Sequence, residues 1–264
     1  METIRVMVSG AAGKMGRTAL AAILSQPDME LVSALDVNGI GEDAALLVGL
    51  PESGIKISGS PQEELLRAKP QVLLDFTNGR AAPSLIENAL DHNCAVVTGS
   101  TGIAPERLEE IERLSREKEA PVLVVPNFSI GAVLLMEFSA RAAKYFDSAA
   151  IIELHHEQKL DAPSGTALKT AEAMSREREN FQFYPSQTVK LEGVRGGESR
   201  GIQIHSVRLP GLLAHQEVLL GAKGELLTLR HDATDRVCFM PGVLLALRGV
   251  RRLKGLTIGL ESLL

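Results

Sequence analysis

Near the N-terminus of this chain, a glycine-rich turn lies between an apolar strand and a helix. Residues 4–8 are rich in β-branched and apolar side chains, and residues 14–25 have the composition of a helix. Between them, Gly10, Gly13 and Gly16 follow a G-x-x-G-x-x-G spacing. Glycines at these positions permit a tight turn and a close approach of the backbone to another group. Because a strand, a turn and a helix in this order begin a βαβ unit, the pattern predicts a parallel sheet.

The rest of the first half repeats this alternation of strands and helices. Predicted strands at residues 31–35, 72–75, 95–97 and 122–125 alternate with predicted helices at 62–68, 82–92 and 105–118. Continuous apolar strands separated by helices are typical of a parallel sheet that is covered on both faces. We therefore expect an α/β fold in which the first domain is a Rossmann-like, doubly wound parallel sheet.

The pattern changes after residue 129. A long helix at 131–145 precedes a strand around Ile151 and a helix at 166–178. Later segments alternate polar and apolar residues as antiparallel strands do, at 188–192, 201–209, 215–220 and 226–231, with a flexible loop expected at 195–197. We expect residues 128–232 to form a smaller α+β domain with a mixed sheet. A final helix at 241–253 should return to the first domain, which would then comprise residues 1–127 and 233–264.

Composition limits the classes of function. A chain of 264 residues is long enough for two domains, and its 45% hydrophobic and 23% charged residues are those of an ordinary globular protein. The net charge of −5 and the aromatic content of 3% argue against nucleic-acid binding, which needs a basic face or stacking rings. No apolar stretch reaches membrane-spanning length. The two cysteines show no CxxC spacing, and we expect a cytoplasmic protein with no membrane partner.

The glycine-rich turn predicts a dinucleotide site. The amide groups and positive dipole at the start of a helix favour a pyrophosphate, and a carboxylate after the second strand accepts hydrogen bonds from the ribose. Asp36 stands at that position. The glycine-rich turn and Asp36, each taken alone, could also belong to an ordinary turn. Further loops follow strands at the edge where ligands bind such sheets. The predicted cofactor contacts are Gly10, Ala11, Ala12, Gly13, Lys14, Met15, Gly16, Asp36, Phe76, Thr77, Gly99, Ser100, Thr101, Val125, Pro126, Asn127 and Phe128.

Residues 153–167 have the composition of a catalytic site. His155 and His156 follow a β-branched pair, so they should lie at the end of a strand, and Lys159 comes within the next few residues. A serine or threonine then supplies the N-cap of an alanine-rich helix. Proton donors, a cation and unpaired helix N–H groups together suit the reduction of an anionic substrate.

Other interpretations of this segment remain open on the residues alone. A pair of adjacent histidines is often structural or exposed, and histidine and glutamate can bind metals. Adjacent residues on a strand point to opposite faces, however, so His155 and His156 would not easily share one ion. Cys94 and Cys238 are far apart in the sequence and offer no further pair of ligands. We therefore expect no metal.

Taken together, these segments resemble the dihydrodipicolinate reductase family, also called 4-hydroxy-tetrahydrodipicolinate reductases, of lysine and diaminopimelate biosynthesis. The resemblance runs along the whole chain, through the segments 8–16, 75–77, 99–102, 126–131, 155–167 and 205–208. The segment 155–167 is highly specific, because we know of no other family that combines it with these nucleotide loops.

The resemblance implies a role for each residue of that segment. His155 would be the catalytic acid/base and Lys159 the proton donor, and the substrate-binding residues would be His156, Lys159, Ser164, Gly165 and Thr166. NADH or NADPH would deliver a hydride to a cyclic dicarboxylate substrate. The two domains of such enzymes close over the substrate, with hinges expected near Phe128 and Asp232. Family members assemble as homotetramers through the sheet of the second domain.

One departure concerns the choice of cofactor. Asp36 is followed by Val37 and Asn38, where some members of the family carry an arginine that would meet the 2′-phosphate of NADPH. A carboxylate repels that phosphate, and an arginine is the usual compensation. The sequence therefore predicts a preference for NADH, although Lys14 or Arg17 could still assist the phosphate.

Two rival functions are consistent with the nucleotide fold. One is another two-domain amino-acid dehydrogenase, of the aspartate or homoserine type, and the other is a non-catalytic NAD(H)-binding redox sensor. Neither requires His155 and Lys159 beside an anion-binding turn, so the segment 153–167 favours the reductase.

Overall fold

The computed structural model describes residues 3–264, and the contacts within it divide the chain into two compact units. The first unit runs to Ser129 and also includes Phe239–Leu264, and the second comprises Ile130–Cys238. The chain therefore leaves the first unit once and returns to it near the C-terminus. No helix in the described part of the chain has the length and apolar character needed to cross a bilayer.

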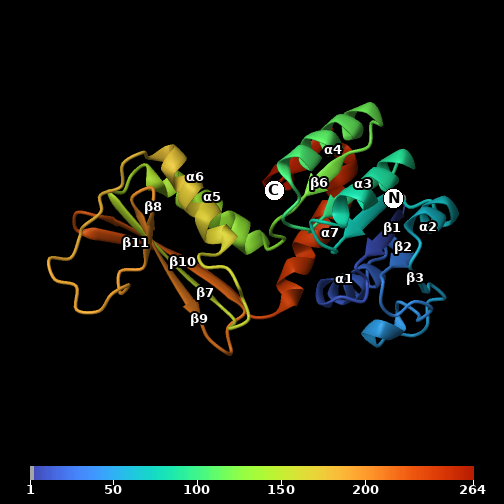
Figure 1. The fold of residues 1–264 in the computed structure, drawn as a ribbon, viewed down its shortest axis with the longest axis horizontal. Coiled ribbons are helices and arrows are strands. Elements are labelled where there is room, and N and C mark those ends of the chain that lie inside the picture. Colours follow the sequence, from blue (N-terminus) through green and yellow to red (C-terminus); the bar gives the residue numbers. More distant parts are fainter. Residues whose placement is uncertain (1–2) are drawn as a thin grey trace. The chain divides into compact units, whose positions relative to one another are not determined.

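The first unit is built on a seven-stranded parallel sheet (Figure 1). Its strands lie in the order β12-β6-β5-β4-β1-β2-β3, and every pairing within it is parallel. The strands are β1 (Ile4–Ser9), β2 (Met29–Leu35), β3 (Ile57–Ser58), β4 (Val72–Asp75), β5 (Ala95–Thr98), β6 (Val122–Val124) and β12 (Leu256–Ile258). The chain reverses its direction of travel across the sheet between β1 and β4, and ligands bind such sheets at that point.

Helices follow the strands because the apolar strands need cover on both faces. They are α1 (Lys14–Leu24), α2 (Pro61–Ala68), α3 (Ala82–Asp91), α4 (Pro105–Glu117) and α7 (Met240–Gly249), with short 3₁₀ turns η1 (Leu46–Val48), η2 (Arg236–Phe239), η3 (Val250–Arg252) and η4 (Glu261–Leu263). Met7 and Leu73 share one core with side chains of α2, α3 and α4. Helix α1 packs beside α7.

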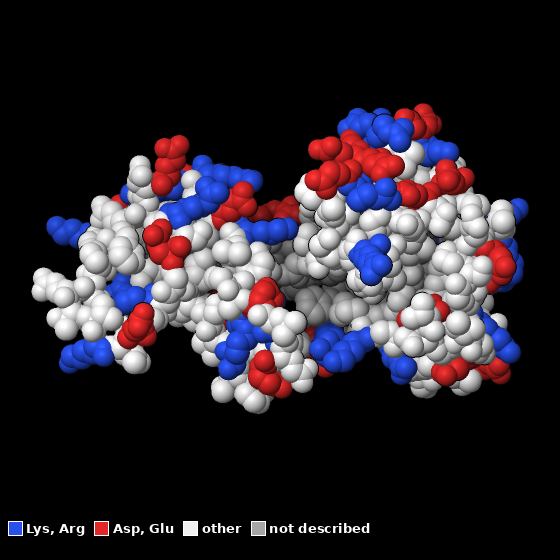
Figure 2. Space-filling model, in the orientation of Figure 1, with Lys and Arg blue, Asp and Glu red and all other residues white. Residues whose placement is uncertain are grey.

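The solvent-facing side of α4 illustrates how the surface of this unit is charged. Arg107 pairs with Glu110, Arg113 with Glu117 and Arg116 with Glu112, each pair one helical turn apart. On the face drawn in Figure 2, basic and acidic side chains are interspersed in the same way. Charges that alternate along a helix are typical of an exposed helix face.

The second unit has a five-stranded mixed sheet with two helices on one face (Figure 1). The strand order is β11-β10-β7-β9-β8, from β7 (Ser148–His155), β8 (Gly197–Ser199), β9 (Ile202–Arg208), β10 (Ala214–Ala222) and β11 (Glu225–Ala233). Helices α5 (Ile130–Ala143) and α6 (Gly165–Glu177) pack on side chains such as Ile151 and Val218. The prediction of a doubly wound parallel sheet followed by a smaller α+β domain with a mixed sheet is confirmed.

Some predicted elements are wrong or incomplete. Residues 188–192 form no strand, and the alternating Val189 and Leu191 stay 58% and 70% exposed. The segment at 195–197, expected as a flexible loop, instead leads into β8, which pairs with β9. The segment 201–209 was expected to be an antiparallel strand, and β9 is antiparallel to β8 but parallel to β7. The short strands β3 and β12 were not predicted.

Candidate active site

The carboxyl end of β7 carries the residues that the sequence analysis singled out. Glu153 and His155 are two residues apart in the strand, so their side chains point to the same face of the sheet. His155 pairs with Arg208 of β9 on one side and with Ala214 of β10 on the other. His156 lies just beyond the end of the strand and is partly exposed. Only His155 therefore belongs to the strand, and the alternation of strand side chains does not apply to His156.

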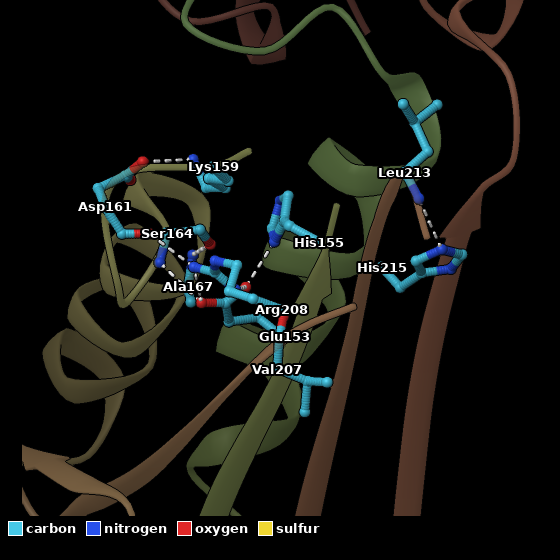
Figure 3. A network of polar contacts seen from close by, with 10 residues as sticks. All are labelled: Glu153, His155, Lys159, Asp161, Ser164, Ala167, Val207, Arg208, Leu213 and His215. Atoms are coloured by element: carbon cyan, nitrogen blue, oxygen red, sulfur yellow. Dashed lines mark hydrogen bonds and ion pairs between the residues drawn. The ribbon is translucent and has the colours of Figure 1, made fainter. Parts of the chain in front are cut away.

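Glu153 is the centre of a polar network at this end of the strand (Figure 3). Its side chain is completely buried, yet it accepts hydrogen bonds from its own strand, from β9 and from the start of α6. The Nδ1 atom of His155 lies 2.5 Å from its Oε2 atom. The two terminal nitrogens of Arg208 donate to both of its oxygens at 2.9 and 2.8 Å, and the amide of Ser164 donates at 3.1 Å.

These partners keep Glu153 ionised. Burial by itself would raise the pKa of the carboxyl, but hydrogen bonds from His155, Arg208 and Ser206 outweigh it and hold the pKa at about 2. The same contact raises the pKa of the Arg208 guanidinium. Glu153 is therefore a permanent acceptor at neutral pH, and the hydrogen between it and His155 belongs to Nδ1.

Lys159 lies in the loop that follows the strand. Its Nζ atom is 2.7 Å from Oδ1 of Asp161, and this contact is the main reason that the pKa of Asp161 is lowered. The backbone carbonyl of Asp161 accepts a hydrogen bond from Arg208 at 2.6 Å. Arg208 thus ties the loop that carries Lys159 to the same carboxylate that holds His155.

Helix α6 begins beside this network. Ser164 is its N-cap, and the serine hydroxyl accepts a hydrogen bond from the amide of Ala167 at 3.1 Å. Its own amide donates to Glu153, so Ser164 is bound on both sides and is only 2% exposed. Within residues 3–264, the amide of Gly165 has no hydrogen-bond partner, as expected in the first turn of a helix. The helix therefore presents a free N–H group and its positive dipole at the end of β7.

The predicted site residues of this unit thus come together, with two additions. His155, Lys159 and the start of α6 surround the carboxyl end of β7 in Figure 3. Glu153 and Arg208 were not predicted to take part. The position of Glu153 two residues before His155 could have revealed it, since residues i and i+2 of a strand share a face. Arg208 is 55 residues from Glu153, and only the pairing of β7 with β9 brings it near.

In the first unit, a cavity of about 430 Å³ opens at the carboxyl ends of β1, β2 and β4. Five predicted cofactor contacts line it, namely Gly10, Gly13, Asp36, Phe76 and Thr77, and so does Val37, which follows Asp36. Others that the sequence analysis missed also line it, among them Ser58, Gly59, Asn78 and Asn88. No sequence pattern marked these residues, because they lie in a short strand, in loops and on a helix face that the fold brings to the cavity.

The glycine-rich turn packs too closely for side chains. Gly10 has a φ of +73°, and a Cβ there would lie 2.6 Å from the carbonyl oxygen of Phe76. A Cβ on Gly16 would lie 2.0 Å from the carbonyl oxygen of Gly10. Gly13 is the N-cap of α1, and no described side chain caps that helix. The first turn of α1 is therefore open to an anion.

Asp36 directly follows β2, beside this turn. Its carboxylate accepts hydrogen bonds from the amide of Ala12 at 2.9 Å and from the amide of Asn38 at 2.9 Å. Arg17 donates to the carbonyl of Ala12 at 2.9 Å, and Lys14 is exposed. A cavity with a carboxylate at one side and an uncapped helix N-terminus at the other fits the ribose and pyrophosphate of a dinucleotide.

The loops after β4 and β5 are joined by a second buried carboxylate. Asp75 is completely buried and accepts hydrogen bonds from Thr77, Thr98 and Ser100. The hydroxyl of Ser100 donates inward to Asp75 at 2.7 Å, so its hydrogen is not available to a ligand.

The remaining predicted cofactor residues lie around an aromatic pair. The rings of Phe76 and Phe128 meet edge to face at 5.5 Å, and a Cβ on Gly99 would contact both rings. Val125 and Phe128 are buried at 1% and 4% exposure, whereas Thr101 is exposed. Within residues 3–264, no three His, Cys, Asp or Glu side chains lie close enough to hold a metal ion.

Two family models match this chain over nearly its whole length. The model described as the N-terminus of dihydrodipicolinate reductase matches residues 4–128, and the model described as its C-terminus matches residues 131–264. Among curated proteins, the 4-hydroxy-tetrahydrodipicolinate reductase of Moorella thermoacetica is 48% identical over 99% of this chain and 98% of its own. That of Listeria innocua is 45% identical over 99% of this chain and 100% of its own.

Solved structures agree with these matches. A dipicolinate-bound dihydrodipicolinate reductase from Paenisporosarcina sp. TG-14 is 41% identical, with a TM-score of 0.88 over 99% of this chain and 100% of that one. An amine dehydrogenase from Mycobacterium smegmatis has a TM-score of 0.69 at 15% identity, which shows a shared fold alone. The resemblance found in the sequence is confirmed: this chain is a reductase that belongs to the dihydrodipicolinate reductase family.

Proposed function

We propose that this protein reduces 4-hydroxy-tetrahydrodipicolinate to tetrahydrodipicolinate, a step of lysine and diaminopimelate biosynthesis. In the balanced reaction, the hydroxylated cyclic dicarboxylate, NAD(P)H and one proton give tetrahydrodipicolinate, NAD(P)⁺ and water. The observation that carries the proposal is the arrangement at the end of β7, where His155 and Lys159 lie beside the open first turn of α6. A relative that is 48% identical along 99% of this chain bears the name of this activity.

The start of α6 is the proposed carboxylate-binding site. The free amide of Gly165 and the helix dipole favour an anion, and the Thr166 side chain stands in the same turn. Lys159 adds a positive charge, and His156 lies at the same strand end. Ser164 acts through the turn that it caps. The homologous structure named for bound dipicolinate contains a ligand of this class, a planar dicarboxylate.

His155 and Lys159 are the proposed proton-transferring residues. Because Nδ1 of His155 donates to Glu153, its Nε2 atom is the one that can exchange a proton with a substrate. The Lys159 amine donates to Asp161, and the carboxylate of a substrate would compete with Asp161 for it. A positioned acid of this kind contributes about 10²–10⁴-fold to a rate.

The first unit is the proposed dinucleotide-binding domain, and the second the substrate and assembly domain. The cavity beside Gly10 and Asp36 fits the adenosine and pyrophosphate, and the loops around Phe76, Gly99 and Asn127 would accept the nicotinamide end. A bound nicotinamide supplies the hydride, and the protein orients it. Val37 is 85% exposed beside Asp36 and carries no charge, which supports a preference for NADH.

A homotetramer in the cytoplasm is the proposed form of the enzyme. The face of the second sheet opposite α5 and α6 presents apolar side chains, among them Ile152, Leu219 and the 66% exposed Leu226. Subunits that joined through this face would bury these side chains. Light scattering coupled to gel filtration tests this point, since four chains of 28.3 kDa differ clearly from one or two.

A coupled assay tests the proposed reaction. A synthase supplies the unstable substrate from pyruvate and aspartate semialdehyde, and absorbance follows NADH and NADPH in parallel. We expect His155→Asn and Lys159→Ala to lower kcat/KM at least 100-fold while the Kd for the dinucleotide stays unchanged. Lys169→Ala, an exposed lysine of α6, is the matched control. Substrate-independent or absent oxidation by the wild-type protein would refute the proposal, and tighter binding of NADPH than NADH would refute the preference.

A further inference from the structure

We infer that Glu153, which is held by Arg208, is a positioning residue. It fixes the tautomer of His155 and also the position of the start of α6. The inference rests on the proposed function, because it assigns a role in the same site. It goes beyond that function in naming two residues that contact neither the substrate nor the cofactor in the proposed reaction.

The first step of the argument is the direction of the hydrogen bond between Glu153 and His155. The carboxylate is ionised at neutral pH and can only accept hydrogen bonds. Nδ1 of His155, at 2.5 Å, must therefore carry the hydrogen whether the imidazole is neutral or charged. Among the described residues 3–264, Nε2 has no partner, so the histidine offers it in a single orientation to whatever binds at the strand end.

The second step is that Glu153 uses both of its oxygens. Oε2 accepts from His155 and from one terminal nitrogen of Arg208, and Oε1 accepts from the other nitrogen and from the amide of Ser164. The same Arg208 nitrogen also donates to the carbonyl of Asp161. One buried carboxylate therefore sets the relative positions of the histidine, the lysine-bearing loop and the carboxylate-binding turn.

The third step separates positioning from mere support. A buried ion pair is weak evidence for stability, since an apolar pair of the same volume often serves as well. An apolar pair could not orient an imidazole or hold the amide of a helix N-cap, and both of these groups belong to the proposed site. The charge of Glu153 is completely buried, and its role in orienting the imidazole and the helix N-cap explains its presence there.

The test uses Glu153→Gln, with Glu157→Gln as the matched control on an exposed residue of the following loop. In Glu153→Gln, the single amide oxygen should stay with Ser164 and Arg208, because the backbone N–H of Ser164 cannot become an acceptor. The amide nitrogen then faces His155 and one terminal nitrogen of Arg208. The arginine cannot accept and loses that hydrogen bond, whereas His155 can become an acceptor by moving its hydrogen from Nδ1 to Nε2. The substitution therefore places the hydrogen on the wrong nitrogen while it preserves the shape of the side chain.

The first readout is the tautomer, measured by nitrogen NMR on the full-length protein with labelled histidine and assigned with His155→Asn. We expect Nδ1–H for His155 in the wild-type protein and in Glu157→Gln, and Nε2–H in Glu153→Gln. An Nε2–H tautomer in the wild-type protein would overturn the inference without any variant. This readout needs no substrate, so it decides the inference even where the proposed reaction itself fails.

The second readout is a double-mutant cycle in the coupled assay. We expect Glu153→Gln to lower kcat/KM about 10²–10⁴-fold with an unchanged Kd for NADH. His155→Asn should then lower it less than tenfold further in that background, against at least 100-fold in the wild type, because the two residues act as a unit. The inference would be overturned if the two substitutions lowered kcat/KM by independent factors that multiply in the double variant. It would also be overturned if kcat/KM of Glu153→Gln stayed within threefold of the wild-type value, and either result would leave the proposed function standing.

Discussion

The buried carboxylate of Glu153 predicts how the stability of this protein depends on pH. The pKa of Glu153 is about 2 in the folded protein, against an ordinary value of 4.5. A carboxyl whose pKa is lowered by folding stabilises the protein above its unfolded pKa, and this stabilisation is lost as the pH falls toward the folded pKa. At 1.36 kcal/mol for each pH unit, the difference corresponds to about 3 kcal/mol at neutral pH.

The same linkage gives the expected course of the loss. Of the stabilisation of about 3 kcal/mol, about 2 kcal/mol should disappear between pH 6 and pH 3, because the unfolded carboxyl is then protonated and the folded one is still mostly ionised. Glu153→Gln has no such titration. The variant should therefore be less stable than the wild type by about 3 kcal/mol at pH 6 and by only about 1 kcal/mol at pH 3.

Urea unfolding followed by far-ultraviolet circular dichroism measures these differences, since the chain has no tryptophan to report by fluorescence. The titration is repeated at several pH values between 6 and 3 for the wild type, for Glu153→Gln and for Glu157→Gln. The exposed Glu157 should give a profile parallel to that of the wild type. A gap between wild type and Glu153→Gln that stays constant across this range would refute the reasoning, because the carboxylate would then have no lowered pKa.

Three further predictions concern single positions. Gly10→Ala should abolish dinucleotide binding and lower the melting temperature, because its Cβ would meet a backbone carbonyl at 2.6 Å. Gly54→Ala is the control, because Gly54 has a similar φ of +80° but a Cβ there would meet no atom within 4 Å. Calorimetry of both variants should show a smaller loss of melting temperature for Gly54→Ala, which has only the strain of the positive φ. Val37→Arg should raise the ratio of kcat/KM for NADPH over NADH about tenfold, and an unchanged ratio would mean that residue 37 does not face the 2′-phosphate. Burial raises the pKa of Cys94 to about 12, so a thiol reagent should modify the partly exposed Cys238 first in the native protein, with mass spectrometry locating the label.

Most of the fold was predictable because its signals are local. Each parallel strand is a short apolar run, and each helix that follows has a helical pattern of its own, so β4 was predicted at its observed bounds. Where the signal depends on a partner, prediction failed. Residues 188–192 alternate as a strand would, but they pair with no strand of the sheet. Strand β12 has only three residues and is a strand because β6 lies beside it.

The residues of the candidate site likewise differ in whether a local sequence signal reveals them. His155, Lys159 and the N-cap of α6 lie within ten residues of one another, and the sequence was sufficient to group them. Arg208 could not be found in this way, since a helix and a long connecting segment separate β7 from β9. The sequence suggests which side chains could do chemistry, whereas the groups that orient them come from neighbouring strands.

Buried carboxylates are the device that orients the loops in both units. Asp43, Asp75 and Glu153 are at most 4% exposed, and each accepts hydrogen bonds from residues that are distant in the sequence or lie in other loops. A buried carboxylate is costly unless its lone pairs are occupied, so each of them requires the surrounding loops to hold one geometry. Asp43 organises the turn between β2 and β3, and Asp75 joins the loops after β4 and β5.

Glu153 differs from the other two in what it holds. The donors around Asp43 and Asp75 are backbone amides and hydroxyls, which orient loops but transfer no protons in the proposed reaction. The donors around Glu153 include an imidazole and a guanidinium, so the same requirement for occupied lone pairs also fixes a proton on one nitrogen of His155. A rule that elsewhere in this protein determines only shape therefore determines, at the end of β7, which atom of the histidine can take part in chemistry.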